Sequence, residues 1–172
     1  MMKFYSHQYH LLFIILLLSV SGISRAGTYV DENLPDPAHE YARLAVYFAD
    51  KQFRRKLDWS VQSIRKVDGI LEKLNQALAK EAPDEKTLML YAKAFGSYVG
   101  EVIHLQHGGY WEKLTLRAIT PQKKFLVFEP WRWAEERIKE GAEKNIWQRY
   151  LQHYGKEKRM PDNSIKRVPI TP

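Results

Sequence analysis

Residues 84–109 read DEKTLMLYAKAFGSYVGEVIHLQHGG and form the predicted helix around which the rest of the fold is built. Asp84 can cap its start, and a pair of glycines ends it. Gly96 and Gly100 lie four residues apart inside this helix, and each costs about 1 kcal/mol relative to alanine. We therefore expect another backbone or an aromatic side chain to pack closely against their face. Apolar side chains repeat at helical spacing at Leu88, Tyr91, Phe95, Tyr98 or Val99, Val102 and Leu105.

Two more helices are predicted before this one. Residues 36–53 carry apolar side chains at three- and four-residue spacing, and Pro37 suits a first helical turn. Residues 57–78 have the most regular apolar stripe of the chain, and either Asp58 or Ser60 can cap that helix. The stripe consists of Leu57, Val61, Ile64, Val67, Leu71, Leu74 and Leu78.

After the glycine pair the apolar pattern alternates, as in a β-strand. We expect one strand from 110 to 118, turn residues at 120–122 and a second strand at 125–128. The two strands should pair as a hairpin that leans on the helices, because an isolated hairpin is marginal in water. In the first strand, one side carries Trp111, Lys113, Thr115 and Arg117, and the other carries mostly Tyr110, Leu114, Leu116 and Ala118.

The chain then returns to helical patterns. Pro130 opens a short helix that Gly141 terminates, and Asn145 with Gln148 resembles a capping box for a last helix that ends at Gly155. The order of elements favours the α+β class. We predict a mainly helical single domain, residues 27–155, with a small antiparallel β-hairpin or sheet packed on the helices.

Residues 1–26 have the three parts of a cleavable secretory signal peptide. Lys3 gives a positive start, residues 11–20 are an uncharged apolar run, and Ser24 and Ala26 are small residues suited to signal peptidase. The run of 10 residues is shorter than the roughly 17–25 that a membrane span needs. The chain also has no cysteine, which excludes a lipoprotein anchor and a disulfide framework. We expect a soluble periplasmic protein, with no membrane span after signal cleavage.

The charge balance is basic, with 27 lysines and arginines against 20 acidic residues and a formal net charge of +7. Such a balance steers a protein toward acidic partners or anionic surfaces. Export and the lack of a recognition motif argue against nucleic acid. Part of the excess lies in residues 156–172, which contain three prolines and no helical stripe, so we predict a flexible basic tail.

Several short motifs lie between residues 57 and 155. They are Leu57-Asp58-Trp59-Ser60 with Ser63 and Val67-Asp68, then Gly96-Ser97-Tyr98-Val99-Gly100-Glu101-Val102 with Gly109 and Trp111, then Pro130, Arg137, Gly141 and a short aromatic-rich helix. Together these motifs resemble a group of uncharacterised bacterial domains of the DUF3806-like type, a domain of unknown function. The resemblance implies a compact helical domain with a small sheet and brings no assigned reaction.

The most suggestive chemical cluster is Glu101, His104 and His107 near the end of one helix. A carboxylate and two neutral imidazoles suit a zinc ion, which is the one cofactor the sequence leaves open. Burial would raise the pKa of Glu101 and make it a general acid. The alternative is structural: histidines near a helix C-terminus interact with its dipole, and Glu101 could pair with Arg117 or Arg137.

The sequence contains no motif for other kinds of chemistry. It lacks a nucleophile elbow, a phosphate loop, a dinucleotide fingerprint and a calcium loop. We expect Gly96, Gly100, Gly109 and Gly141 to serve the structure. Aromatic residues and arginine dominate binding hot spots. The predicted binding residues are therefore Trp111, Trp131, Trp133 and Arg137, although much aromatic area must also enter the core.

Two functions follow from these patterns. The first is a non-enzymatic periplasmic binding or interaction protein with a protein partner, for example of the immunity or inhibitor type. The second is a small metal-dependent or acid/base hydrolase that uses Glu101, His104 and His107.

Overall fold

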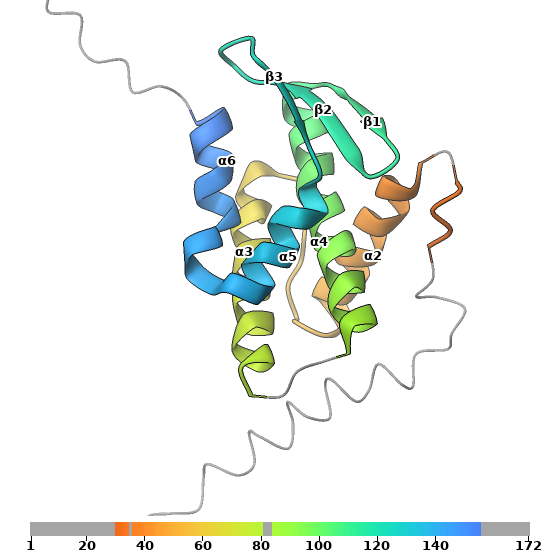
Figure 1. Cartoon of the computed structure of the whole chain (residues 1–172), viewed down its shortest axis with the longest axis vertical. Helices are drawn as coiled ribbons and strands as arrows, with labels where there is room; N and C mark the ends of the chain where they lie inside the picture. The colour runs from red at the N-terminus through yellow and green to blue at the C-terminus, as the bar shows by residue number, and fades with distance from the viewer. Residues whose placement is uncertain (1–29, 35, 81–83, 156–172) are drawn as a thin grey trace, which may run out of the picture.

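Helix α4 (Glu85–His107) is the centre of the computed structural model, which describes residues 30–34, 36–80 and 84–155 (Figure 1). Helices α2 (Pro37–Lys51), α3 (Val61–Leu78) and α5 (Pro130–Glu140) pack against it, as does strand β2 (Thr115–Ile119). A short 3-10 turn, η3 (Gly141–Lys144), joins α5 to the last helix, α6 (Ile146–Tyr154). The mainly helical α+β class is confirmed. The predicted signal peptide and basic tail lie outside the described residues.

Helices α2, α3, α4 and α6 begin at side-chain caps, whereas α5 begins at Pro130 without one. Asp36 accepts a hydrogen bond from the backbone N–H of His39, and Asp84 accepts one from that of Thr87. Ser60, rather than Asp58, caps α3. That helix therefore begins at Val61, and the side chain of Leu57 joins the core from the preceding segment.

The two glycines inside α4 lie where other segments come closest to it. A Cβ on Gly96 would lie 2.6 Å from the carbonyl oxygen of Pro130 and would also meet the Cα of Trp131. A Cβ on Gly100 would lie 2.7 Å from Cγ of Pro130 and would meet the indole ring of Trp111. The first turn of α5 and one aromatic ring thus provide the close approach that the glycine spacing predicted.

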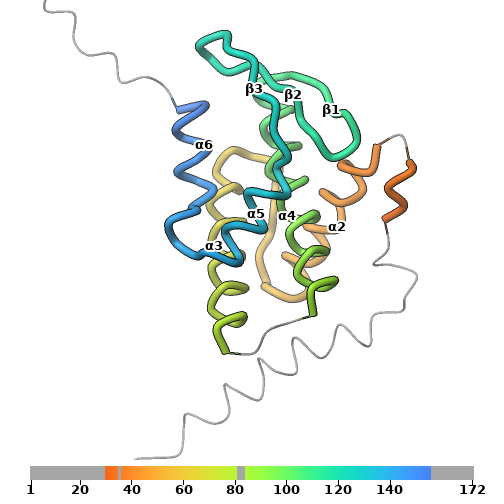
Figure 2. Tube along the Cα trace, in the orientation of Figure 1, coloured from red at the N-terminus to blue at the C-terminus, as the bar shows by residue number. Residues whose placement is uncertain are grey.

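The sheet has three antiparallel strands in the order β1-β2-β3, where β1 is Tyr110–Glu112 and β3 is Phe125–Phe128. The prediction of one strand from 110 to 118 was wrong. Lys113 has a positive φ of 56° and lies in a tight turn between Glu112 and Thr115, which reverses the chain. Figure 2 shows the resulting path, with the loop between β2 and β3 projecting beyond the helices.

The turn also changes the side of the sheet on which Trp111 lies. Trp111 is paired with Leu116, and directly paired residues of antiparallel strands share a face. Leu116 and Ala118 are fully buried, so this inner face of the sheet packs on the helices. Trp111 therefore points inward with Leu116, whereas an uninterrupted strand would have placed it on the opposite face.

None of the helices in the described residues combines the length and the apolar character needed to cross a bilayer.

Candidate functional site

Glu101 lies on α4 beneath β1 and is 8% exposed. The indole N–H of Trp111 donates a hydrogen bond to its Oε2 at 3.0 Å. Its Oε1 lies 3.7 Å from Nδ1 of His39, a residue of α2 that is distant in sequence. The carboxylate thus holds the Trp111 ring against Gly100, and neither Arg117 nor Arg137 is its partner.

Those two arginines are engaged elsewhere. Nη2 of Arg117 lies 2.9 Å from Oε2 of Glu112 on the neighbouring strand. Arg137 is only 2% exposed; its Nε donates to Asp68 at 3.1 Å and its Nη2 donates to Glu72. The hydrogen bond from Arg137 holds the pKa of Glu72 below its usual value. Arg137 was expected among the binding residues, but the structure makes it a buried link between α5 and α3.

Asp68 also fastens the last helix. It accepts hydrogen bonds from the backbone N–H of Ile146 at 2.8 Å and from the side chain of Asn145 at 2.7 Å. One buried carboxylate therefore joins α3, α5 and the start of α6.

The three side chains of the predicted zinc site do not come together. His107 follows Glu101 by six residues, which turns it by about 240° around the helix axis. Its Nε2 lies 3.1 Å from the hydroxyl of Tyr150, and its ring stacks on Tyr154 at 4.4 Å between centroids. Burial lowers the pKa of His107. Nδ1 of His104 is buried without a hydrogen-bond partner among the described residues.

In the described ranges, no group of three or more histidine, cysteine, aspartate or glutamate side chains is arranged to hold a metal ion. Glu101 and His107 each have partners from other elements, on different sides of α4. Through these contacts, Glu101 and His107 both connect α4 to other elements of the fold.

The two tryptophans of α5 are half-buried. Trp133 stacks between Phe128 of β3, at 4.4 Å, and His153 of α6, at 5.8 Å. The guanidinium of Arg149 lies 5.7 Å from the centre of the Trp133 ring. Two aromatic neighbours therefore stack on this ring, which makes it part of the packing between β3, α5 and α6. Trp131 places its backbone against Gly96, and the guanidinium of Arg132 lies 5.2 Å from its ring centre.

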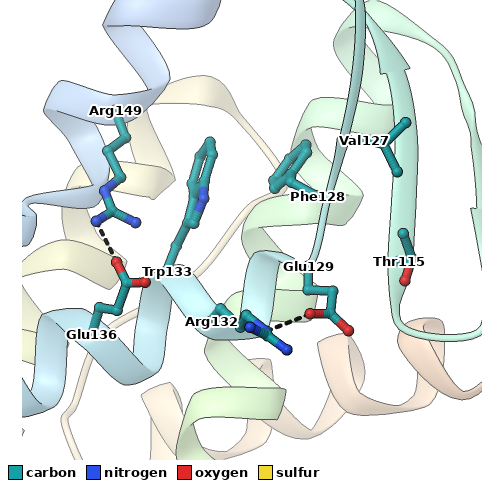
Figure 3. A pocket seen from close by; sticks show the side chains of 8 residues that line it. All are labelled: Thr115, Val127, Phe128, Glu129, Arg132, Trp133, Glu136 and Arg149. Atoms are coloured by element: carbon teal, nitrogen blue, oxygen red, sulfur yellow. Dashed lines mark hydrogen bonds and ion pairs between the residues drawn. The ribbon is translucent and has the colours of Figure 1, made fainter.

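A groove of about 580 Å³ opens between β3 and the helices α5 and α6 (Figure 3). Its ion pairs join Glu129 to Arg132 and Glu136 to Arg149. Phe128 and Trp133 face each other between these pairs (Figure 3). The groove is lined by Thr115, Val127, Phe128, Glu129, Arg132, Trp133, Glu136 and Arg149.

The outer face of the sheet, on the side away from the helices, is unusually apolar for an exposed surface. Of the eight large hydrophobic side chains that are exposed in the described residues, four lie here. The strand register joins them: Arg117 is paired with both Tyr110 and Val127, and Ile119 is paired with Phe125. The four, which we call the outer apolar patch, are Tyr110 (54% exposed), Ile119 (44%), Phe125 (65%) and Val127 (49%).

Cations border this patch at the loop between β2 and β3. Lys123 and Lys124 are exposed, and their ammonium groups have no ion-pair partner within the part of the chain that the structure describes. The acidic residues nearest in sequence are already paired, Glu112 with Arg117 and Glu129 with Arg132. The loop end of the patch is therefore positively charged.

Sequence reasoning did not find the outer apolar patch. Of the four residues, only Tyr110 was assigned to a face of the sheet from the sequence. That assignment assumed that the first strand was uninterrupted. The usable signal was the strand FLVF at 125–128, which is apolar at every position and must therefore show apolar side chains on both faces.

Comparison of the chain with protein-family models, with curated proteins and with solved structures finds no match, and the resemblance to DUF3806-like domains stays a prediction.

Proposed function

We propose that this protein is an exported, soluble periplasmic binding protein without catalytic activity, and that the outer apolar patch holds a partner protein. The observation that carries this proposal is that four large exposed apolar side chains share one face of a small sheet, beside the ion pair of Arg117 with Glu112. Soluble monomers rarely expose such patches without using them in an interaction. The sequence of residues 1–26 supports the export.

The energetics favour this face as a binding surface. Burying one large apolar side chain stabilises a complex by about 1.5–3 kcal/mol. Phe125 is 65% exposed and lies between Val127 and the charged loop, so it has the most to gain from a partner. Lys123 and Lys124, which have no ion-pair partner among the described residues, would speed the approach of an acidic surface and help select it.

The hydrolase alternative loses support from the surroundings of Glu101. Its carboxylate accepts the Trp111 hydrogen bond and faces His39, and the groove between β3 and the helices is lined by other residues. This arrangement suits a carboxylate that fixes β1 to α4.

Capture of the partner tests the proposal. The purified protein, immobilised and exposed to periplasmic extract of its own host, should retain a specific protein, and Phe125→Ser should lose it. Leu105→Ser is the matched control, because Leu105 is a 57% exposed apolar residue that belongs to α4 and is not part of the outer apolar patch. Equal capture by the wild type and Phe125→Ser, with loss in Leu105→Ser, would contradict the assignment of the surface.

A further inference from the structure

We propose that the partner binds as an extended acidic segment that adds a fourth strand to the free edge of β3. This inference rests on the proposed function, since it names the kind of partner that the outer apolar patch holds. It is carried by the exposed edge of β3, by the groove beside it and by the charge at its loop end.

Strand β3 is an edge strand, because the sheet order is β1-β2-β3 and only β2 pairs with it in the described residues. Proteins usually protect such an edge by keeping the strand short, as β3 is with four residues, or with a charged residue, a proline or a bulge. Residues 125–128 contain neither a charge nor a proline, and all four pair in continuous register with β2. As far as the described residues go, this edge is open to an incoming strand.

The register identifies which backbone groups are free. The N–H of Thr120 donates to the carbonyl of Lys124, so that pair is hydrogen-bonded across the hairpin. Hydrogen-bonded and non-hydrogen-bonded pairs alternate in an antiparallel ladder. Leu126 and Phe128 therefore bond to β2, whereas Phe125 and Val127 direct their N–H and C=O groups toward the open edge. These two residues also carry exposed side chains of the outer apolar patch.

The groove favours one extended segment over a folded body. It is bounded by Val127 to Glu129 on the strand side and by Trp133 and Arg149 on the helix side (Figure 3). An added strand would lie about 4.8 Å from β3, on the side of the strand where this groove opens. Strand addition obtains affinity from main-chain hydrogen bonds and specificity from alternate side chains.

The charge of the surroundings selects an acidic segment. Lys123 and Lys124 precede β3 directly and lack ion-pair partners in the described residues. At the other end of the strand, Glu129 is neutralised by Arg132. An acidic side chain on the incoming segment would be stabilised at the loop end, and a basic one would be repelled there.

The test uses synthetic peptides and the whole protein. The probe is a fluorescent, capped heptapeptide in which valine alternates with threonine and which ends in two aspartates. One comparison peptide carries N-methyl groups on alternate amides, which removes main-chain donors. The other replaces the aspartates with lysines. Fluorescence anisotropy measures binding of each peptide to the wild type, to Val127→Pro and to the matched control Val127→Thr.

Val127→Pro removes an N–H that points away from β2, so the ladder within the sheet is kept. We expect this variant to bind the acidic peptide at least about tenfold more weakly than the wild type, and Val127→Thr to bind it within about threefold. The N-methylated and lysine-containing peptides should bind the unaltered protein at least about tenfold more weakly, which tests the edge and the charge without any mutation.

Several results would overturn the inference. The first is that the acidic peptide does not bind the wild type. The second is that Val127→Pro binds this peptide as tightly as the wild type does, and the third is that the N-methylated peptide binds the wild type as tightly as the unmodified one. Sedimentation of the wild type as a dimer that Val127→Pro dissociates would mean that a second copy covers the edge. Binding to phosphatidylglycerol vesicles in place of the peptide would mean that the patch meets a membrane. If Phe125-dependent capture persists while the peptide tests fail, only the strand addition is wrong and the proposed function stands.

Discussion

Gly96 is the point at which α5 rests on α4. The backbone of Pro130 and Trp131 lies where a side chain would begin, and backbone atoms cannot move aside as a flexible side chain can. Gly69, on α3, lies in the opposite situation: it is exposed, and a Cβ there would meet nothing within 4 Å. The same substitution should therefore have opposite effects at the two positions.

Gly96→Ala should lower the free energy of unfolding by about 1–3 kcal/mol or more, because it overpacks a backbone contact. Gly69→Ala should raise it by about 0.5–1 kcal/mol through helix propensity. Urea denaturation of both variants measures these changes. Equal and small effects would show that α5 does not press on α4 as described.

At the scale of elements, α5 and α6 are held to α3 by the buried group formed by Arg137, Asp68 and Asn145. Removal of one partner of a buried ion pair leaves a charge without compensation. Arg137→Met should therefore destabilise the protein by about 3–5 kcal/mol in urea denaturation. Lys139→Met, at an exposed ion pair of the same helix, should change stability by no more than about 1 kcal/mol. Similar small losses in both variants would argue against the buried link.

His107 connects α4 to α6 through Tyr150 and Tyr154, and burial lowers its pKa below 6.5. Between the folded pKa and 6.5 the unfolded chain binds more protons, so this residue makes stability fall as the pH drops through that window. The loss levels off below the folded pKa.

Thermal unfolding across this range measures the effect. The wild type should lose stability as the pH falls from about 7.5 to about 5, and His107→Gln should lose less over the same interval. An unchanged pH profile in the variant would show that His107 is not held neutral by its burial.

For the whole molecule, local sequence patterns were sufficient to predict the helices. Helices α2, α3 and α4 each have a side-chain cap and a regular apolar stripe, whereas α5 lacks such a cap but begins at Pro130 and ends at Gly141. These patterns failed where contacts between residues far apart in the sequence determine the local structure. Nothing local distinguishes Lys113 as a turn residue, and the turn there determines which face Trp111 takes. Leu105 continues the stripe of α4 but is 57% exposed, so the helical spacing alone did not predict its burial correctly. The partners of Glu101 and Arg137 come from other helices, and spacing along one helix cannot reveal them.

Export is a separate property of the whole molecule. We expect the protein purified from the periplasm to begin at Gly27, because Ser24 and Ala26 are suited to signal peptidase. Mass spectrometry of the intact protein measures this directly. A chain that retains Met1 and stays in the cytoplasm would contradict the proposed location.

Site-specific photo-crosslinking in living cells tests the binding surface most directly. A photoreactive phenylalanine analogue would replace Phe125 in the outer apolar patch, and Tyr47 on α2, which is 43% exposed, in a matched control. If the outer apolar patch binds the partner as proposed, we expect a discrete crosslinked protein adduct at position 125 and none at position 47. An adduct at position 47 with none at position 125 would contradict the claim that the outer face of the sheet binds the partner.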